Sequence, residues 1–290
     1  MKTNKRLNMN VGKTLIRTLM IPDPPTLNPN DPLAEAIGKV NEFGVGRVIV
    51  GKEKVVGLVT TRDLLELIVQ ECPEGCPENV MKDVLYAPVK NHMVCSPSVA
   101  YENDLALDII NVMVSHDYGS MPVVDKAYAP KGIVTEREFL LLYQDLPKTH
   151  KVKSFATSRV ATIDSGIRLE EAVSLMIRRG FRRLPVVDSE GKVIGIITAA
   201  DAIKAFAKFI EKKNPSFFFG KKVSEVMKSP VLSISPETYV NDAAKELLDK
   251  KKGSFMILDE NGKVSGIITE RDLLIALHHM LHIQAMKTGE

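Results

Sequence analysis

A short motif that occurs four times constrains this chain more than any other feature. Each copy reads glycine, two aliphatic residues, threonine, two variable residues and an acidic residue. The threonines stand at positions 60, 135, 198 and 269, so successive copies are 75, 63 and 71 residues apart. Recurrence at such near-regular spacing indicates one supersecondary unit that is present four times.

The residues around the third copy show what this unit contains. The apolar runs Leu184 to Val187 and Val193 to Thr198 flank a turn at Gly191. Two β-branched runs around a glycine-containing turn predict a hairpin. A helix is expected from Ala199, and a short strand and a helical stripe precede each hairpin. The sequence therefore predicts an α+β fold of four β-α-β-β-α repeats.

The expected division of the chain follows these repeats. A basic N-terminal extension is expected at residues 1–14. The repeats are expected at 15–70, 89–145, 152–210 and 223–283, with connectors at 71–88 and 211–222. The run Phe217-Phe218-Phe219 in the second connector is too apolar for a free loop, so we expect it to pack on a helix or at an interface.

Composition excludes several classes of protein. The 290 residues are 44% hydrophobic and 26% charged, as in soluble globular proteins. A net charge of +3 is too small to indicate nucleic-acid binding, and no apolar run approaches the ~20 residues of a membrane span. No apolar segment of a secretory signal follows the basic N-terminus. We therefore expect a cytoplasmic protein.

Cysteine and histidine spacings give weak indications of a metal. Cys72 and Cys76 are four residues apart, but a structural zinc site needs four ligands, and a loop disulfide or two free thiols is the simpler interpretation. His278 and His282 share a helix face, although the glutamate of a zinc-protease motif is replaced by His279. We expect surface histidines and no metal.

Enzymatic motifs are missing from the sequence. Gly12-Lys13-Thr14 resembles the end of a phosphate-binding loop, but that motif needs a glycine five residues before Gly12, where Leu7 stands. No nucleophile and base, and no pair of catalytic carboxylates, can be identified. We expect a binding protein and not an enzyme.

The repeats resemble the cystathionine-β-synthase (CBS) domain over roughly residues 15 to 277. The matching features are the four motif endings and the strands Pro-Val-Val-Asp at 122 and 185, together with the first-strand pairs Thr26-Leu27, Thr162-Ile163 and Ser233-Ile234. In that family the domains pack in pairs, sheet against sheet. A chain of four resembles two such pairs, or Bateman modules, assembled into a disc, as in the gamma subunit of AMP-activated protein kinase.

The motif ending suits an adenosine ligand. A carboxylate only accepts hydrogen bonds, and a ribose diol offers two donors to it. Threonine and the helix N-terminus can meet a phosphate. The resemblance implies that the acids bind ribose: Asp63, Glu138, Asp201 and Asp272. In Glu138 the extra methylene moves the carboxylate by ~1.5 Å, which sets the second site apart.

The remaining contacts are also carried over by position. The residues expected near phosphate are Thr60, Thr135, Thr198, Thr269, Arg47, Arg182, Arg183, Arg137 and Arg271, with help from Arg62. Those expected at the adenine are Thr26, Thr162, Ile163, Ser233, Pro122 and Pro185. The simpler interpretation is that threonine and acid at a helix start are caps, and both roles can coexist.

These residues favour one function over three others. We expect a sensor of AMP, ADP or ATP that acts on an unknown protein partner, with a homodimer possible. A module for another adenosyl ligand, such as S-adenosylmethionine or a dinucleotide, is the alternative, although the arginines favour phosphate. Nucleic-acid binding through the basic N-terminus, and an enzyme hidden in the repeats, are the remaining hypotheses.

Overall fold

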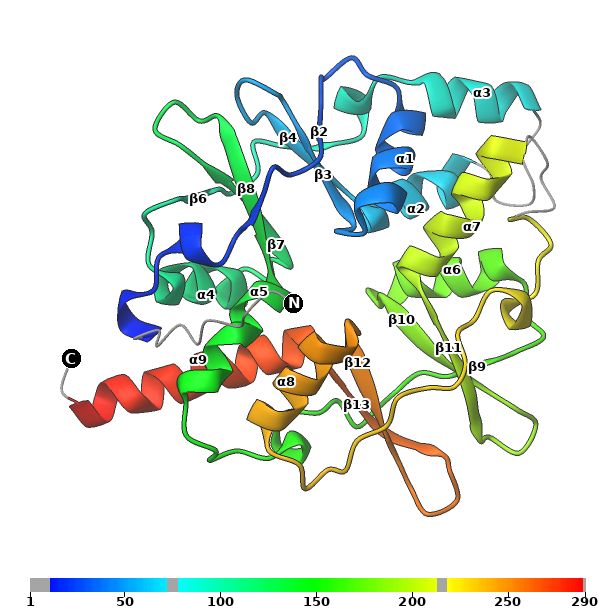
Figure 1. Cartoon of the computed structure of the whole chain (residues 1–290). Helices are drawn as coiled ribbons and strands as arrows, with labels where there is room; N and C mark the ends of the chain where they lie inside the picture. The colour runs from blue at the N-terminus through cyan, green and yellow to red at the C-terminus, as the bar shows by residue number, and fades with distance from the viewer. Residues whose placement is uncertain (1–10, 72–77, 213–217, 289–290) are drawn as a thin grey trace, which may run out of the picture.

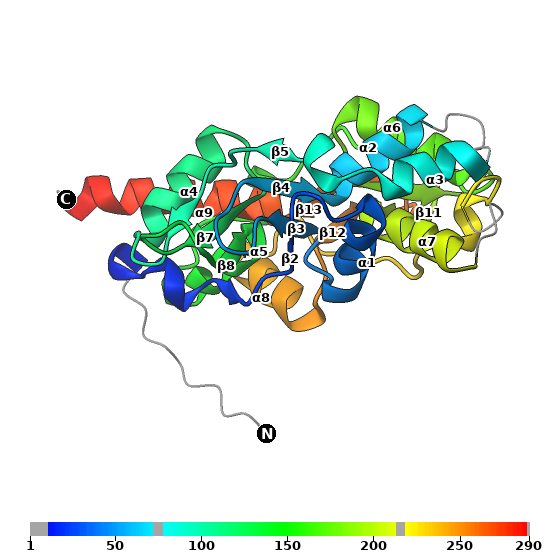
Figure 2. The ribbon, with the colours of Figure 1, turned by 90° about the horizontal axis from the view of Figure 1, so that it is seen from above.

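Four similar units surround a common centre in the structure, a computed structural model that describes residues 11–71, 78–212 and 218–288. Going around the centre, their order is repeat 1, repeat 2, repeat 4 and repeat 3 (Figure 1). The view from above shows a flattened molecule, wider than it is deep (Figure 2). The predicted α+β fold of four repeats is confirmed.

The strands and helices of each repeat follow the expected order. Repeat 1 contains β2 (Thr26–Leu27), α1 (Leu33–Phe43), β3 (Arg47–Val50), β4 (Gly57–Thr60) and α2 (Thr61–Glu71). Repeat 2 contains β6 (Ala100–Tyr101), α4 (Ala106–Ser115), β7 (Ser120–Val124), β8 (Pro130–Thr135) and α5 (Glu136–Phe139), which continues as the 3-10 helix η4 (Leu140–Asp145). The first connector contains a helix that the sequence analysis did not predict, α3 (Glu78–Tyr86).

The second half repeats this arrangement. Repeat 3 contains β9 (Ile163–Asp164), α6 (Leu169–Arg179), β10 (Arg183–Val187), β11 (Val193–Thr198) and α7 (Ala199–Lys212). Repeat 4 contains α8 (Val240–Lys250), β12 (Ser254–Leu258), β13 (Val264–Thr269) and α9 (Glu270–Thr288), and its first strand is a single bridge from Ser233 to Met256. The two strands of each hairpin are antiparallel. The first strand of each repeat lies parallel to the first strand of its hairpin.

Each repeat begins with a lead segment that pairs with the last strand of a different repeat. The lead segments are residues 16–22, 89–95, 152–158 and 223–229, and each begins in a short 3-10 helix whose first residue is fully buried. The antiparallel pairings join Ile21 to Ile133, Val94 to Leu58, Thr157 to Ile267 and Lys228 to Ile196. Repeats 1 and 2 therefore exchange lead segments and form a first pair, and repeats 3 and 4 form a second.

This exchange explains the glycine of the repeated motif. A Cβ atom on Gly132 would lie 2.5 Å from the sulfur of Met20, and one on Gly195 would lie 2.6 Å from the sulfur of Met227. Gly57 makes the same close approach to Met93. Because these methionines belong to the incoming lead segments, these three copies of the motif need glycine for space and not for an unusual backbone angle.

Hydrophobic cores join the two pairs to each other. One core is shared by repeats 1 and 3, and a second by repeats 2 and 4. Helix α7 packs against α1 and α2 on one side of the molecule, and α9 packs against α4 and α5 on the other. A smaller apolar cluster lies between the sheets of repeats 1 and 2. The pairs are thus held internally by sheets and lead segments and held to each other by helices.

The structure also bears on the predicted packing of the phenylalanine run in the second connector. Phe218 is fully buried and contacts Phe206 and Phe219 edge to face, which confirms the predicted packing for these two members of the run. Phe217, Cys72, Cys76 and the first ten residues lie outside the described residues. Within the described ranges, no helix has both the length and the apolar character needed to cross a membrane.

Candidate functional site

The four motif endings form the same structure at four strand-to-helix corners. In each, the backbone N–H of the threonine donates to one carboxylate oxygen of the acid three residues later. The distances are 2.8 Å for Thr60 to Asp63, 2.9 Å for Thr135 to Glu138, 3.0 Å for Thr198 to Asp201 and 2.8 Å for Thr269 to Asp272. The acids therefore cap their helices, as the simpler interpretation expected.

The cap leaves part of each carboxylate for other partners. In repeats 2, 3 and 4 the carboxylate oxygen that accepts from the threonine N–H also accepts from the threonine hydroxyl. The hydroxyl-to-carboxylate oxygen distances are 2.6, 2.5 and 2.7 Å. Glu138 forms this arrangement as Asp201 and Asp272 do, so its extra methylene is accommodated. Burial raises the pKa of Glu138 and of Asp272, against the hydrogen bonds from threonine that lower it.

Two arginines at the start of a hairpin reach across their pair. Arg47 stands opposite Thr60 in the sheet, and its Nη2 donates to the carbonyl of Gly119 in repeat 2 at 3.1 Å. Arg183 stands opposite Thr198 and donates to the carbonyl of Gly253 in repeat 4. A Cβ on either glycine would lie 3.0 Å from the guanidinium, so glycine makes room for the arginine.

These two guanidinium groups lie near a third arginine and near the carboxylates of Glu136 and Glu270. Burial and the neighbouring Arg182 lower the pKa of both Arg47 and Arg183. The Nε atom of Arg47 is buried and has no hydrogen-bond partner in the described part of the chain. Buried donors are almost always paired, so this N–H is suited to an anionic oxygen that the chain itself does not supply.

The third predicted arginine of this group lies at the centre of the molecule. The Nη2 atom of Arg182 in repeat 3 contacts both carboxylate oxygens of Glu136 in repeat 2, at 2.8 and 2.9 Å. Glu136 is only 3% exposed, whereas the Arg182 side chain is 41% exposed. Arg182 therefore joins the two pairs, and its side chain stays partly exposed to solvent.

Arg137 and Arg271 have a role that the sequence analysis did not predict. Arg137 donates to the carbonyls of Lys252, Leu247 and Leu248 at the end of α8, at 3.0 to 3.3 Å. Arg271 in turn donates to carbonyls at the end of α4. These carbonyls lie at or just beyond the C-termini of α8 and α4, where a cation is favourable.

Arg62 makes the equivalent contact from repeat 1, donating to the carbonyl of Ile177 in α6 at 3.0 Å. The three arginines occupy the same motif position, and we call them the arginine latches. The fourth copy has Ala200 there. Because the latches already donate to main-chain carbonyls across the interface between the pairs, they are less suited to phosphate than Arg47 and Arg183.

The predicted adenine contacts divide into two groups. Thr162 and Ser233 are exposed, and Thr26 is half-buried, as expected for side chains that face a ligand. Ile163 is 7% exposed and belongs to the core shared by repeats 1 and 3, so it faces away from the corner. Pro122 and Pro185 are buried, and they alternate with core residues along their strands.

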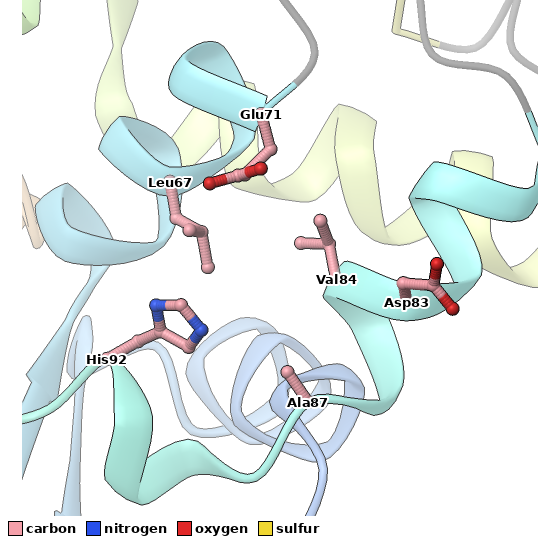
Figure 3. A pocket seen from close by; sticks show the side chains of 6 residues that line it. All are labelled: Leu67, Glu71, Asp83, Val84, Ala87 and His92. Atoms are coloured by element: carbon pink, nitrogen blue, oxygen red, sulfur yellow. The ribbon is translucent and has the colours of Figure 1, made fainter.

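A hollow of about 320 Å³ lies away from the corners, between α2 and α3 (Figure 3). Its lining residues are Leu67, Glu71, Asp83, Val84, Ala87 and His92. None of them was predicted as a site residue. In Figure 3 the Asp83 carboxylate points away from the hollow. The described residues also contain no cluster of three or more side chains suited to a metal ion.

The C-terminal histidines are close to one another. The Nε2 atoms of His278 and His282 are 3.0 Å apart, and His282 also lies 3.2 Å from the Asn111 side-chain oxygen. Burial lowers the pKa of His278, and His282 adds to that effect.

Known proteins resemble this chain in both sequence and fold. A family model described as the CBS domain matches residues 16–70, 89–145, 152–208 and 223–279. The uncharacterized protein MJ1225 of Methanocaldococcus jannaschii is 27% identical over 266 residues, which cover 86% of this chain and 93% of the relative. The crystal structure of MJ1225, described as a proposed archaeal homolog of g-AMPK, covers 91% of this chain and 100% of that one, at 24% identity and a TM-score of 0.78.

An enzyme is also among the similar proteins. The inosine-5'-monophosphate dehydrogenase of Methanocaldococcus jannaschii is 35% identical over 116 residues. These residues are 40% of this chain but only 22% of the dehydrogenase. The similarity is therefore confined to a minor part of that enzyme and says nothing of catalysis in this chain.

Proposed function

The chain belongs to the CBS domain family, and on that premise we propose that it binds AMP, ADP or ATP at the corners of its repeats and signals their balance to a protein partner. Binding takes place without turnover, since the corners contain caps and cations but no nucleophile with a base. The protein is then a regulator that senses the energy state of the cell.

One observation carries this proposal. In one hairpin of each pair, the threonine that binds the acid stands opposite an arginine that reaches the other repeat of the pair. Arg47 faces Thr60, and Arg183 faces Thr198, in the register of the two sheets. The carboxylate oxygen that the cap does not use can accept from a ribose hydroxyl. The unpaired buried Nε–H of Arg47 can donate to a phosphate oxygen.

The same arginines weigh against S-adenosylmethionine. That ligand carries a positive sulfonium and no phosphate, so Arg47, Arg182 and Arg183 would repel it. Burial, and after it the repulsion from Arg182, lowers the pKa of Arg47 and Arg183, and a nucleotide phosphate would offset that repulsion. The expected order of affinity is therefore adenine nucleotide first and S-adenosylmethionine second.

Signalling requires two arrangements of the chain that differ in nucleotide affinity. Exchanged lead segments couple the two corners of a pair, because each lead segment lies beside the last strand of the other repeat. A ligand that draws an acid and an arginine together would shift the packing of the pair, and the helices shared between pairs would pass this change on.

The test is isothermal titration with AMP, ADP, ATP and S-adenosylmethionine. Asp63→Asn and Asp272→Asn keep a capping oxygen and lose the charge that a ribose diol prefers. Asp259→Asn is the matched control, because Asp259 also accepts backbone N–H groups but does so at the hairpin tip. Weaker binding in the two corner variants, with the control unchanged, supports the proposal. No heat with any adenine nucleotide would overturn it.

A further inference from the structure

The four acids do not have the same surroundings. Asp201 is only 5% exposed, and both of its carboxylate oxygens are engaged. Its Oδ2 accepts from the N–H and hydroxyl of Thr198, and its Oδ1 forms an ion pair with the ammonium of Lys228. In the part of the chain that the structure describes, the hydrogen bonds accepted by the other three acids fall on a single oxygen.

Lys228 reaches Asp201 because of its place in a lead segment. It pairs with Ile196, two residues before Thr198, and the corresponding lead residues pair two residues before the other threonines. Those three residues are Ile21, Val94 and Thr157. At this lead position, one corner in four therefore receives a cation, and the other three receive an uncharged side chain.

The ammonium of Lys228 competes with a ribose for the same oxygen. A lysine ammonium is a donor with a full positive charge, and its bond to a carboxylate is stronger than that of a neutral hydroxyl. The Lys228 side chain is 60% exposed, whereas Asp201 is nearly buried, so the lysine approaches the acid from the solvent side. That is also the side from which a ligand must enter.

We infer that Lys228 occupies the ribose position of the Asp201 corner, so this corner binds nucleotide more weakly than the Asp63 corner. The inference rests on the proposed function and adds which corner fills last. It assigns Lys228 a selective role, because the chain itself supplies the cation that keeps one of its four corners closed.

A reciprocal exchange of lead residues tests this inference. Lys228→Val gives the Asp201 corner the residue found beside Asp63, and Val94→Lys does the reverse. Both positions tolerate such a change in the fold, since the Lys228 side chain is 60% exposed and Val94 is 50% exposed. In a titration with AMP, we expect Lys228→Val to show one additional binding site, or about tenfold tighter binding at the weakest site. We expect Val94→Lys to lose one site, or about tenfold in affinity for AMP at the Asp63 corner.

Further variants assign the change to a corner. The gain in Lys228→Val should disappear when Asp201→Asn is added. Unchanged binding in both lead variants, with binding by the unaltered chain intact, would overturn the inference and leave the proposed function standing. Weaker binding in Lys228→Val would also overturn it, by showing that the lysine contacts phosphate. Absence of binding in every variant would overturn the proposed function, and the inference with it.

Discussion

Replacing Arg137 by alanine should weaken the interface between the two pairs far more than replacing Arg62, its counterpart in repeat 1. The Arg137 guanidinium donates to three carbonyls of repeat 4 at 3.0 to 3.3 Å and to Glu270 at 2.8 Å. In the described residues Arg62 donates to one carbonyl, that of Ile177. The two variants remove the same side chain from the same position of the repeat, so each controls for the other.

The contacts set the size of the expected effect. A typical net hydrogen bond contributes about 0.5–1.5 kcal/mol. The Arg137 side chain is 27% exposed, so water can replace part of what is lost. We therefore expect Arg137→Ala to lower the free energy of unfolding by about 3 kcal/mol, and Arg62→Ala to lower it by about 0.5–1 kcal/mol.

The chain has no tryptophan, so urea unfolding is best followed by far-UV circular dichroism. Because a chain of this size loses about 2–4 °C of Tm for each kcal/mol, Arg137→Ala should also melt at least roughly 6 °C lower. Equal costs for the two variants would refute the reasoning, because the number of carbonyls satisfied would then be irrelevant. A cost below about 1 kcal/mol for Arg137→Ala would refute it as well.

Three further predictions follow from single contacts. Gly132→Ala should lower the free energy of unfolding by about 1–3 kcal/mol, because its Cβ would meet the sulfur of Met20. Gly38→Ala, in open space on a helix, should raise it by about 0.5–1 kcal/mol. Changes of the same sign in urea unfolding would contradict this. Hydrogen bonds from two lysines lower the pKa of Glu237 from 4.5 to about 2. Its stabilising contribution is therefore present above pH 4.5 and lost as the pH falls to about 2. The urea midpoints of Glu237→Gln and the unaltered chain should differ at pH 7 and converge towards pH 2. Ala200→Arg should raise the urea midpoint by adding a latch to the end of α1, and an unchanged midpoint would count against it.

Much of the fold could be predicted from local patterns. The hairpins and the helices that follow them were predicted from apolar runs, turn glycines and the four motif endings. Helix α3 was not predicted, because it lies in a connector that contains no copy of the repeated motif from which the other helices were predicted. The exchange of lead segments was also out of reach, since a short strand carries no signal of which repeat it will join.

The site was predicted less completely than the fold. The capping of each helix by its acid followed from spacing and chemistry alone. The latches were predicted as phosphate contacts because an arginine near an expected ligand suggests charge pairing, and the structure shows that they donate to carbonyls of another repeat. A signal was present: arginine follows the motif threonine by two residues in three copies, at 62, 137 and 271. Only the packing of helices across the molecule shows what those arginines contact.

The centre of the molecule shows how a repeated frame acquires different sites. In each pair the first repeat supplies an arginine, Arg47 or Arg183, and the second supplies a glycine that admits it, Gly119 or Gly253. The two pairs are alike to this point.

They then differ by single residues. Arg182 pairs with Glu136 across the centre, whereas the first pair has Gly46 at the position of Arg182. Lys228 approaches Asp201, whereas Val94 lies at the equivalent place beside Asp63. Since the backbone frame is common to both pairs, we attribute the proposed difference in nucleotide affinity between these corners to these substitutions. Exchanging residues between equivalent positions is therefore a more direct test of function than deleting them.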